Sequence, residues 1–163
     1  MLRINVELNK EKRITVLEQA ASNNNGVIKF FLKKSGTSSS INETTPISKE
    51  IVVKSVRLDS VLPMDLNLPI ILIDVEGAEN LVIEGATNFI NQTLPLIIFE
   101  FNHISRMYFS IIDIKNLLGN DYMIFRLRKD GYLDRELNST WNCIAVSNKS
   151  DFFSLIQPLI LSN

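Results

Sequence analysis

The 163-residue sequence contains one cysteine and one histidine. A single cysteine cannot form an internal disulfide, so we expect Cys143, in the strand-like run NCIAV, to be a free thiol in the core. A nucleophilic cysteine needs a base beside it, which disfavours a catalytic thiol in a chain with one histidine. The cysteine usage therefore predicts a reducing, cytoplasmic location.

The sequence also lacks an excess of charge of either sign. Its 17 Lys and Arg residues nearly balance 18 Asp and Glu residues, which gives a formal net charge of -1. The basic residues are spread along the chain, so we expect neither a nucleic-acid partner nor binding to an anionic membrane. The first ten residues contain no signal-like apolar run, and the tail is too short and too interrupted by proline to span a bilayer, which predicts no membrane anchor.

Phosphate-binding glycine loops are absent from the sequence. The chain has six glycines and no two of them are two residues apart, so neither GxGxxG nor GxxxxGK[ST] occurs. This excludes a standard dinucleotide-binding loop and a standard ATP-binding loop. Gly77 instead follows a strand and precedes a helix, where we expect it to adopt a positive φ.

What the sequence does contain is the composition of one globular domain over residues 1–163, with 45% hydrophobic and 21% charged residues. Strand-forming residues predict a hairpin of residues 13–21 and 27–34, joined at Asn25-Gly26. Residues 35–50 are rich in Ser and Thr and predict a loop, and residues 51–58 predict another strand.

The middle of the chain predicts a β-α-β unit. Residues 69–75 form a continuous apolar run, expected for a strand covered on both faces, and residues 94–102 form a second one. Between them, residues 78–92 carry apolar positions at helical spacing. Ser110 and Asp113 predict a capping box at the start of a helix at 110–119. An antiparallel pair of strands is expected near the C-terminus. Together these elements predict an α/β fold with a parallel centre and antiparallel edge strands.

Acidic residues follow both strands of this unit. Asp74 and Glu100 stand at the carboxyl ends, and neighbouring strands about 4.8 Å apart would place them roughly 6 Å from each other. Their repulsion would be on the order of 3 kcal/mol at an effective dielectric of about 20. A shared proton, an internal Arg or Lys, a metal or a cationic ligand could relieve it. Glu76 lies on the following turn, and Glu79, in the first helical turn, is expected to be solvated.

His103 follows the second strand and is a candidate general base in the same crevice. The alternative is a hydrogen-bonded histidine in a loop.

Three segments together resemble a known family. VRLDSVL at 56–62, ILIDVEGAENLVIEGA at 71–86 and LPLIIFEFN at 94–102 are similar to the FkbM-type S-adenosylmethionine-dependent methyltransferases, whose pattern joins a Leu-Asp pair, a strand ending in Asp-Val-Glu-Gly-x-Glu and a Pro-led strand ending in Glu. The resemblance extends upstream over NVELNKEKRITVLEQAASNNNGVIKFF.

This resemblance implies a Rossmann-like fold and methylation of a hydroxyl group on a sugar, lipid or secondary metabolite, with S-adenosyl-L-methionine as cofactor and no metal. Asp74 and Glu76 would lie near the methyl group, with Asp74 also contacting the cofactor, and Glu100 would flank the acceptor. Gln19, Ala20 and Ala21 would line the adenine pocket.

The family's glycine-rich loop and its first strands have no counterpart in this sequence, which leaves a strand edge open. The alternative function is therefore a truncated, non-catalytic interaction module that self-associates or binds a partner through this edge. A third hypothesis is a carboxylate metal site built from Asp74, Glu76 and Glu100.

Overall fold

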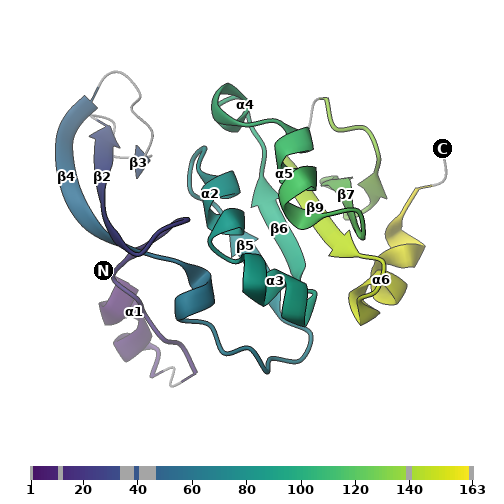
Figure 1. Ribbon diagram of the computed structural model, residues 1–163, viewed down its shortest axis with the longest axis horizontal. Helices are drawn as coiled ribbons and strands as arrows, with labels where there is room; N and C mark the ends of the chain where they lie inside the picture. The colour runs from purple at the N-terminus through teal and green to yellow at the C-terminus, as the bar shows by residue number, and fades with distance from the viewer. Residues whose placement is uncertain (1, 11–12, 34–38, 41–46, 139–140, 162–163) are drawn as a thin grey trace.

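The computed structural model describes residues 2–10, 13–33, 39–40, 47–138 and 141–161 (Figure 1). Two sheets lie side by side in Figure 1, a four-stranded sheet of order β1-β4-β2-β3 near the N-terminus and a five-stranded sheet of order β5-β6-β9-β7-β8. The predicted mixture of helices with parallel and antiparallel strands is confirmed, although the strands form two sheets where we expected one.

The first sheet pairs its strands differently from the prediction. After α1 (Leu2–Leu8), residues 13–19 are irregular and only β1 (Ala20–Ala21) is a strand. β1 runs parallel to β4 (Ile47–Val56), and it is β4 that pairs antiparallel with β2 (Gly26–Lys33). The predicted hairpin at Asn25-Gly26 is therefore wrong.

The asparagine side chains explain this difference. Ser55 Oγ donates to Asn24 Oδ1 at 2.8 Å, and the Arg57 backbone N–H donates to Asn25 Oδ1 at 2.8 Å. The turn is thus tied to the end of β4, a distant segment, and does not close a two-residue hairpin.

The loop predicted for residues 35–50 lies largely outside the described residues. Two parts of it are strand, because β3 (Ser39–Ser40) pairs with β2 and residues 47–50 begin β4. The loop prediction is wrong for these two parts.

The second sheet contains the predicted parallel pair. β5 (Ile70–Ile73) runs parallel to β6 (Leu96–Glu100), and β9 (Asn142–Ser147) pairs antiparallel on the other side of β6. β7 (Tyr122–Leu127) and the short β8 (Leu133–Asp134) continue the sheet, so the antiparallel pair near the C-terminus is confirmed. Among the described strands, none pairs with the free side of β5.

The two faces of β5 differ in burial. Ile73 is buried and Ile71 packs against the core on the face that carries α2 (Glu79–Glu84), α3 (Thr87–Thr93) and α5 (Ile111–Leu118). Ile70 and Leu72 point the other way and are 59% and 72% exposed. The prediction that both faces are covered is wrong, because the helix on that other side, α6 (Asp151–Ile156), packs on β9 and does not reach β5.

The helix predicted for residues 78–92 is two helices, α2 (Glu79–Glu84) and α3 (Thr87–Thr93). At the break, a Cβ on Gly85 would lie 2.0 Å from the Ser22 carbonyl oxygen, so the chain passes too close for any side chain. The carboxylate of Asp59, in η1 (Leu58–Ser60), accepts the Phe89 N–H at 2.9 Å and so begins α3 separately.

The remaining helices follow local signals. The predicted capping box is confirmed, since Ser110 and Asp113 bond reciprocally at the start of α5 (Ile111–Leu118), which ends at Gly119. α4 (Ser105–Tyr108) follows β6, and η2 (Gln157–Leu159) follows α6. Cys143 is buried in the core as predicted. In the part of the chain that the structure describes, no helix combines the length and apolarity needed to cross a bilayer.

Candidate functional site

The parallel register brings the two acidic strand ends together. Ile73 of β5 pairs with Phe99 of β6, and one further step along both strands places Asp74 opposite Glu100. Alternation of side chains puts both residues on the face that carries the exposed Leu72. The topology therefore produces the convergence of carboxylates expected from the sequence.

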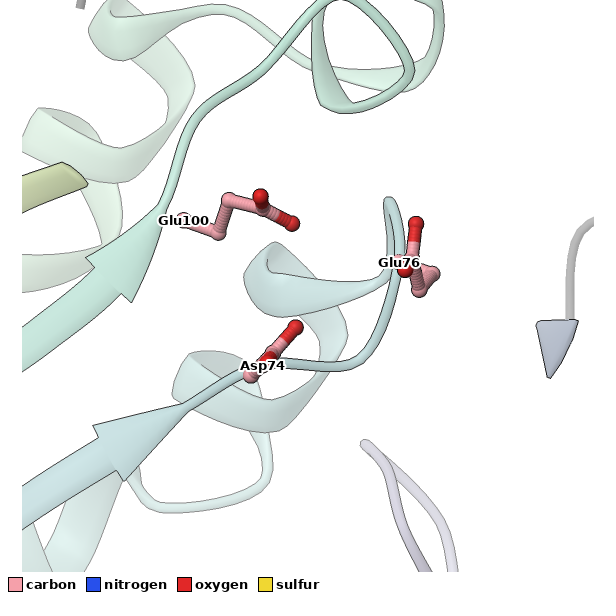
Figure 2. A group of neighbouring side chains, drawn as sticks. All are labelled: Asp74, Glu76 and Glu100. Atoms are coloured by element: carbon pink, nitrogen blue, oxygen red, sulfur yellow. The ribbon is translucent and has the colours of Figure 1, made fainter. Parts of the chain in front are cut away.

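Glu76 joins this pair to form a cluster of three carboxylates. One carboxylate oxygen of each of Asp74, Glu76 and Glu100 lies within 4.8 Å of the other two. Figure 2 shows Asp74 and Glu100 extending from neighbouring strand ends toward the turn that carries Glu76. Two unit charges at this separation repel by about 3.5 kcal/mol at an effective dielectric of about 20, an upper figure because exposed groups such as Asp74 are screened by water.

The charges of the cluster affect the pKa of Glu100. Partial burial raises the pKa of its carboxyl above the ordinary value, and the charges of Asp74, Glu76 and Glu79 raise it further. A hydrogen bond with the Asn102 side chain acts in the opposite direction but does not cancel the shift. A carboxylate with a raised pKa is a stronger base than an ordinary one, which suits Glu100 to the role of a general base.

A left-handed turn directs Glu76 toward the cluster. Glu76 has a φ of 55° and Gly77 a φ of 94°, so the positive φ expected at Gly77 is confirmed. A left-handed conformation at a residue other than glycine costs on the order of 1 kcal/mol or more. The surrounding structure must compensate for this strain.

Glu79 supplies part of that compensation. It is fully buried and its Oε1 accepts the backbone N–H groups of Gly77 at 3.1 Å and Val75 at 3.4 Å. Its Oε2 accepts the Ser105 hydroxyl at 3.1 Å. The prediction that Glu79 is solvated is wrong, because it lies on the same helical face as the buried Val82 and Ile83. This spacing of three and four residues was the signal in the sequence that could have found it.

His103 is placed elsewhere. It is exposed, and its ring packs against the Trp141 ring in a T-shaped arrangement with centroids 5.9 Å apart. It belongs neither to the carboxylate cluster nor to the residues that line the neighbouring cavity.

That cavity, of about 510 Å³, lies between the two sheets. Gln19, Ala20 and Ala21 line it from the first sheet, and Asp74 lines it from the end of β5. The rest of the lining is mainly apolar and comes from Glu18, Phe30, Val53, Val75 and Ala78. The four residues expected to bind a cofactor are thus brought to one cavity, whose size is in the range of small-molecule sites.

The same cavity wall could hold either a cation or an organic ligand. Apolar side chains and an amide suit a neutral heteroaromatic ring, and Asp74 at the rim suits a positive charge. The three carboxylates would also suit a hard divalent ion, so the carboxylate metal site stays a prediction.

A crevice at the carboxyl ends of parallel strands is where α/β enzymes bind their ligands. Comparison with known proteins shows to which family the chain belongs. The sequence model described as the methyltransferase FkbM domain matches residues 2–132, which is most of the chain, so the chain belongs to the FkbM methyltransferase family.

A solved structure shares the fold. The crystal structure of the methyltransferase FkbM from Methylobacillus flagellatus KT matches with a TM-score of 0.52 and 19% sequence identity over 89% of this chain. The chain spans only 31% of that protein's length, and at this identity the likeness concerns the fold alone. No curated protein matches the sequence.

Proposed function

We propose that this chain carries the acidic part of an S-adenosylmethionine-dependent methyl-transfer site that acts on a hydroxyl group of a small molecule. Membership of the FkbM family supports methyl transfer. The observation that carries the proposal is the convergence of Asp74, Glu76 and Glu100 beside a cavity that Gln19–Ala21 also line. Sugars, lipids and secondary metabolites all offer such a hydroxyl.

The residues present fit the cofactor. S-adenosylmethionine supplies an electrophilic methyl group on a sulfonium cation. Ala20, Ala21 and Phe30 offer an apolar surface for its adenine ring, and Gln19 offers hydrogen bonds to the ring edge. Asp74 and Glu76 would lie toward the positive charge and would be stabilised by it, which relieves the repulsion within the cluster.

Glu100 would act on the acceptor. A hydroxyl group must lose its proton as it becomes a nucleophile, and a carboxylate with a raised pKa is a better base than an ordinary one. His103, whose ring lies beside that of Trp141, stays a second candidate base.

Calorimetry of the 163-residue chain would test the charge part of this proposal. The cation S-adenosylmethionine should bind more tightly than the neutral S-adenosylhomocysteine, and Asp74→Asn should reduce this preference about fivefold, which corresponds to about 1 kcal/mol for a screened charge pair. Asp65→Asn, an exposed aspartate in the segment before β5, is the matched control and should change neither affinity. Equal preference in the Asp74 variant and the wild-type chain would contradict the assigned role.

The free edge of β5 favours a second candidate function, an interaction module. No strand among the described residues pairs with this edge, which lies beside the exposed side chains of Ile70 and Leu72, and such an edge can bind another strand. We propose that this edge pairs with a second copy or a partner strand. Sedimentation should then show association that Leu72→Lys weakens, whereas a wild-type chain that is monomeric at all concentrations would exclude self-association.

A cytoplasmic location and the absence of nucleic-acid and membrane partners also stay predictions. The near balance of acidic and basic residues and the single buried Cys143 support them.

A further inference from the structure

Three buried polar side chains lie behind the acidic cluster. Glu79 and Ser105 have no exposed surface, and Asn102 is 4% exposed. None of the three lines the cavity between the sheets, so they are not placed to contact a ligand there. Within the described part of the chain, no buried side-chain nitrogen or oxygen lacks a hydrogen-bond partner, so the buried polar atoms of these residues are each bonded to the protein.

The first half of their network holds the turn after β5. Glu79 accepts the N–H groups of Val75 and Gly77 with one carboxylate oxygen. These two residues flank Glu76, whose left-handed φ needs support. The other carboxylate oxygen accepts the hydroxyl of Ser105, which lies at the start of α4.

The second half of the network holds the segment after β6. Asn102 Oδ1 accepts the N–H of Ile104 at 2.7 Å and of Ser105 at 3.0 Å. The Asn102 side chain also forms a hydrogen bond with Glu100. These hydrogen bonds join the turn that carries Glu76 to the segment after β6, and the Asn102 side chain extends the link to the partly buried Glu100.

We propose that Glu79, Ser105 and Asn102 are positioning residues that hold the two acidic strand ends at a fixed separation. A buried carboxylate is unfavourable unless its hydrogen bonds are satisfied, and position 79 faces the core like Val82 and Ile83. A leucine would fill that position, but its side chain could not form hydrogen bonds with the turn or with α4. The link keeps the carboxylates close in spite of their mutual repulsion. This positioning role rests on the proposed function in one respect only, namely that the carboxylates are used in methyl transfer.

Amide hydrogen exchange measured by NMR on the 163-residue chain tests this link directly. Asn102→Ala should speed exchange of the Gly77 amide about fivefold, although Asn102 does not contact Gly77, because the buried hydrogen bonds act together. Glu79→Leu should speed exchange of the Gly77 amide at least about tenfold, because that N–H loses its acceptor. Glu79→Gln keeps an oxygen acceptor for the turn and offers an NH₂ group that the Ser105 hydroxyl can accept, so it should restore most of the protection.

The matched control is Ser110→Ala, which removes the cap of α5 without touching the network and should leave Gly77 unchanged. Two results would overturn the proposal: faster exchange after Asn102→Ala confined to residues 104 and 105, or equal loss of protection in the Gln and Leu variants at position 79. If Glu79→Leu does not fold, Glu79→Gln and Asn102→Ala still decide the question. No cofactor enters the measurement, so failure of the methyl-transfer proposal would leave its result intact.

Discussion

Replacing Glu100 by glutamine should stabilise the folded protein at neutral pH. The Glu100 carboxylate is partly buried and faces the charges of Asp74, Glu76 and Glu79, all of which raise its pKa. Glutamine has nearly the same shape and keeps an oxygen and a polar NH₂ group for the contact with Asn102. The change therefore removes charge from the cluster and alters little of the packing.

The magnitude follows from the separation within the cluster. At 4.8 Å the unscreened figure is about 3.5 kcal/mol per pair at a dielectric of about 20, and solvent around the exposed Asp74 reduces it severalfold. We expect Glu100→Gln to raise the free energy of unfolding by about 1 kcal/mol at pH 7.5. For a domain of this size that corresponds to an increase in Tm of about 2–4 °C.

The pH dependence has a definite sign. Because its folded-state pKa is raised, Glu100 keeps its proton to a higher pH in the folded chain than in the unfolded chain. Stability is therefore lost as the pH rises from the ordinary carboxyl value of 4.5 through the raised pKa. Urea unfolding of both proteins should show the advantage of Glu100→Gln at pH 7.5 and its near absence at pH 4.

Salt and a control variant complete the test. The advantage should shrink at high salt, where a Debye length of about 3 Å at 1 M screens the cluster. Asp65→Asn, which removes one exposed carboxylate in the segment before β5, should give no comparable gain. A Glu100 variant that is less stable at pH 7.5, or equally changed at both pH values, would refute the view that charge repulsion dominates the site.

Three further variants test the scaffold of the site by urea unfolding. Asp59→Ala removes the acceptor of the Phe89 N–H and should cost about 2 kcal/mol, a loss that the Asn variant should roughly halve; equal losses would contradict the capping role. Gly85→Ala places a Cβ 2.0 Å from the Ser22 carbonyl oxygen and should cost at least about 2 kcal/mol. Ser110→Ala should cost about 1 kcal/mol through its lost cap, and unchanged stability in either of these two variants would refute its explanation.

The parts of the fold that follow from local signals were predictable from the sequence. The capping box of Ser110 and Asp113 lies within four residues, so its helix could be placed without knowledge of any partner. The apolar runs of β5 and β6, with a helical stripe between them, likewise predicted a parallel pair. Pairing in the first sheet was not predictable, because Asn24 and Asn25 act through contacts with Ser55 and Arg57 some thirty residues away.

The same distinction applies to the site. The convergence of Asp74 and Glu100 follows from parallel strands whose ends meet at one edge, which the sequence already implied. The burial of Glu79 was missed because a charge in the first turn of a helix is usually explained by the helix dipole. Its partner Ser105 lies 26 residues away in the sequence, and only the folded structure shows that the two groups meet.

The buried hydrogen bonds behind the cluster explain how three carboxylates that repel one another can lie close together. Carboxylates that repel one another ordinarily separate into solvent. A side chain on an unconstrained loop can do so at little cost in free energy. Here Glu79 fixes the turn of Glu76, while Asn102 holds Glu100 from behind. These contacts limit how far the turn that carries Glu76 can move away from Glu100. A cation that entered the space between these carboxylates would relieve the repulsion without reorganising the site, which is the preorganisation that the proposed methyl-transfer function would need.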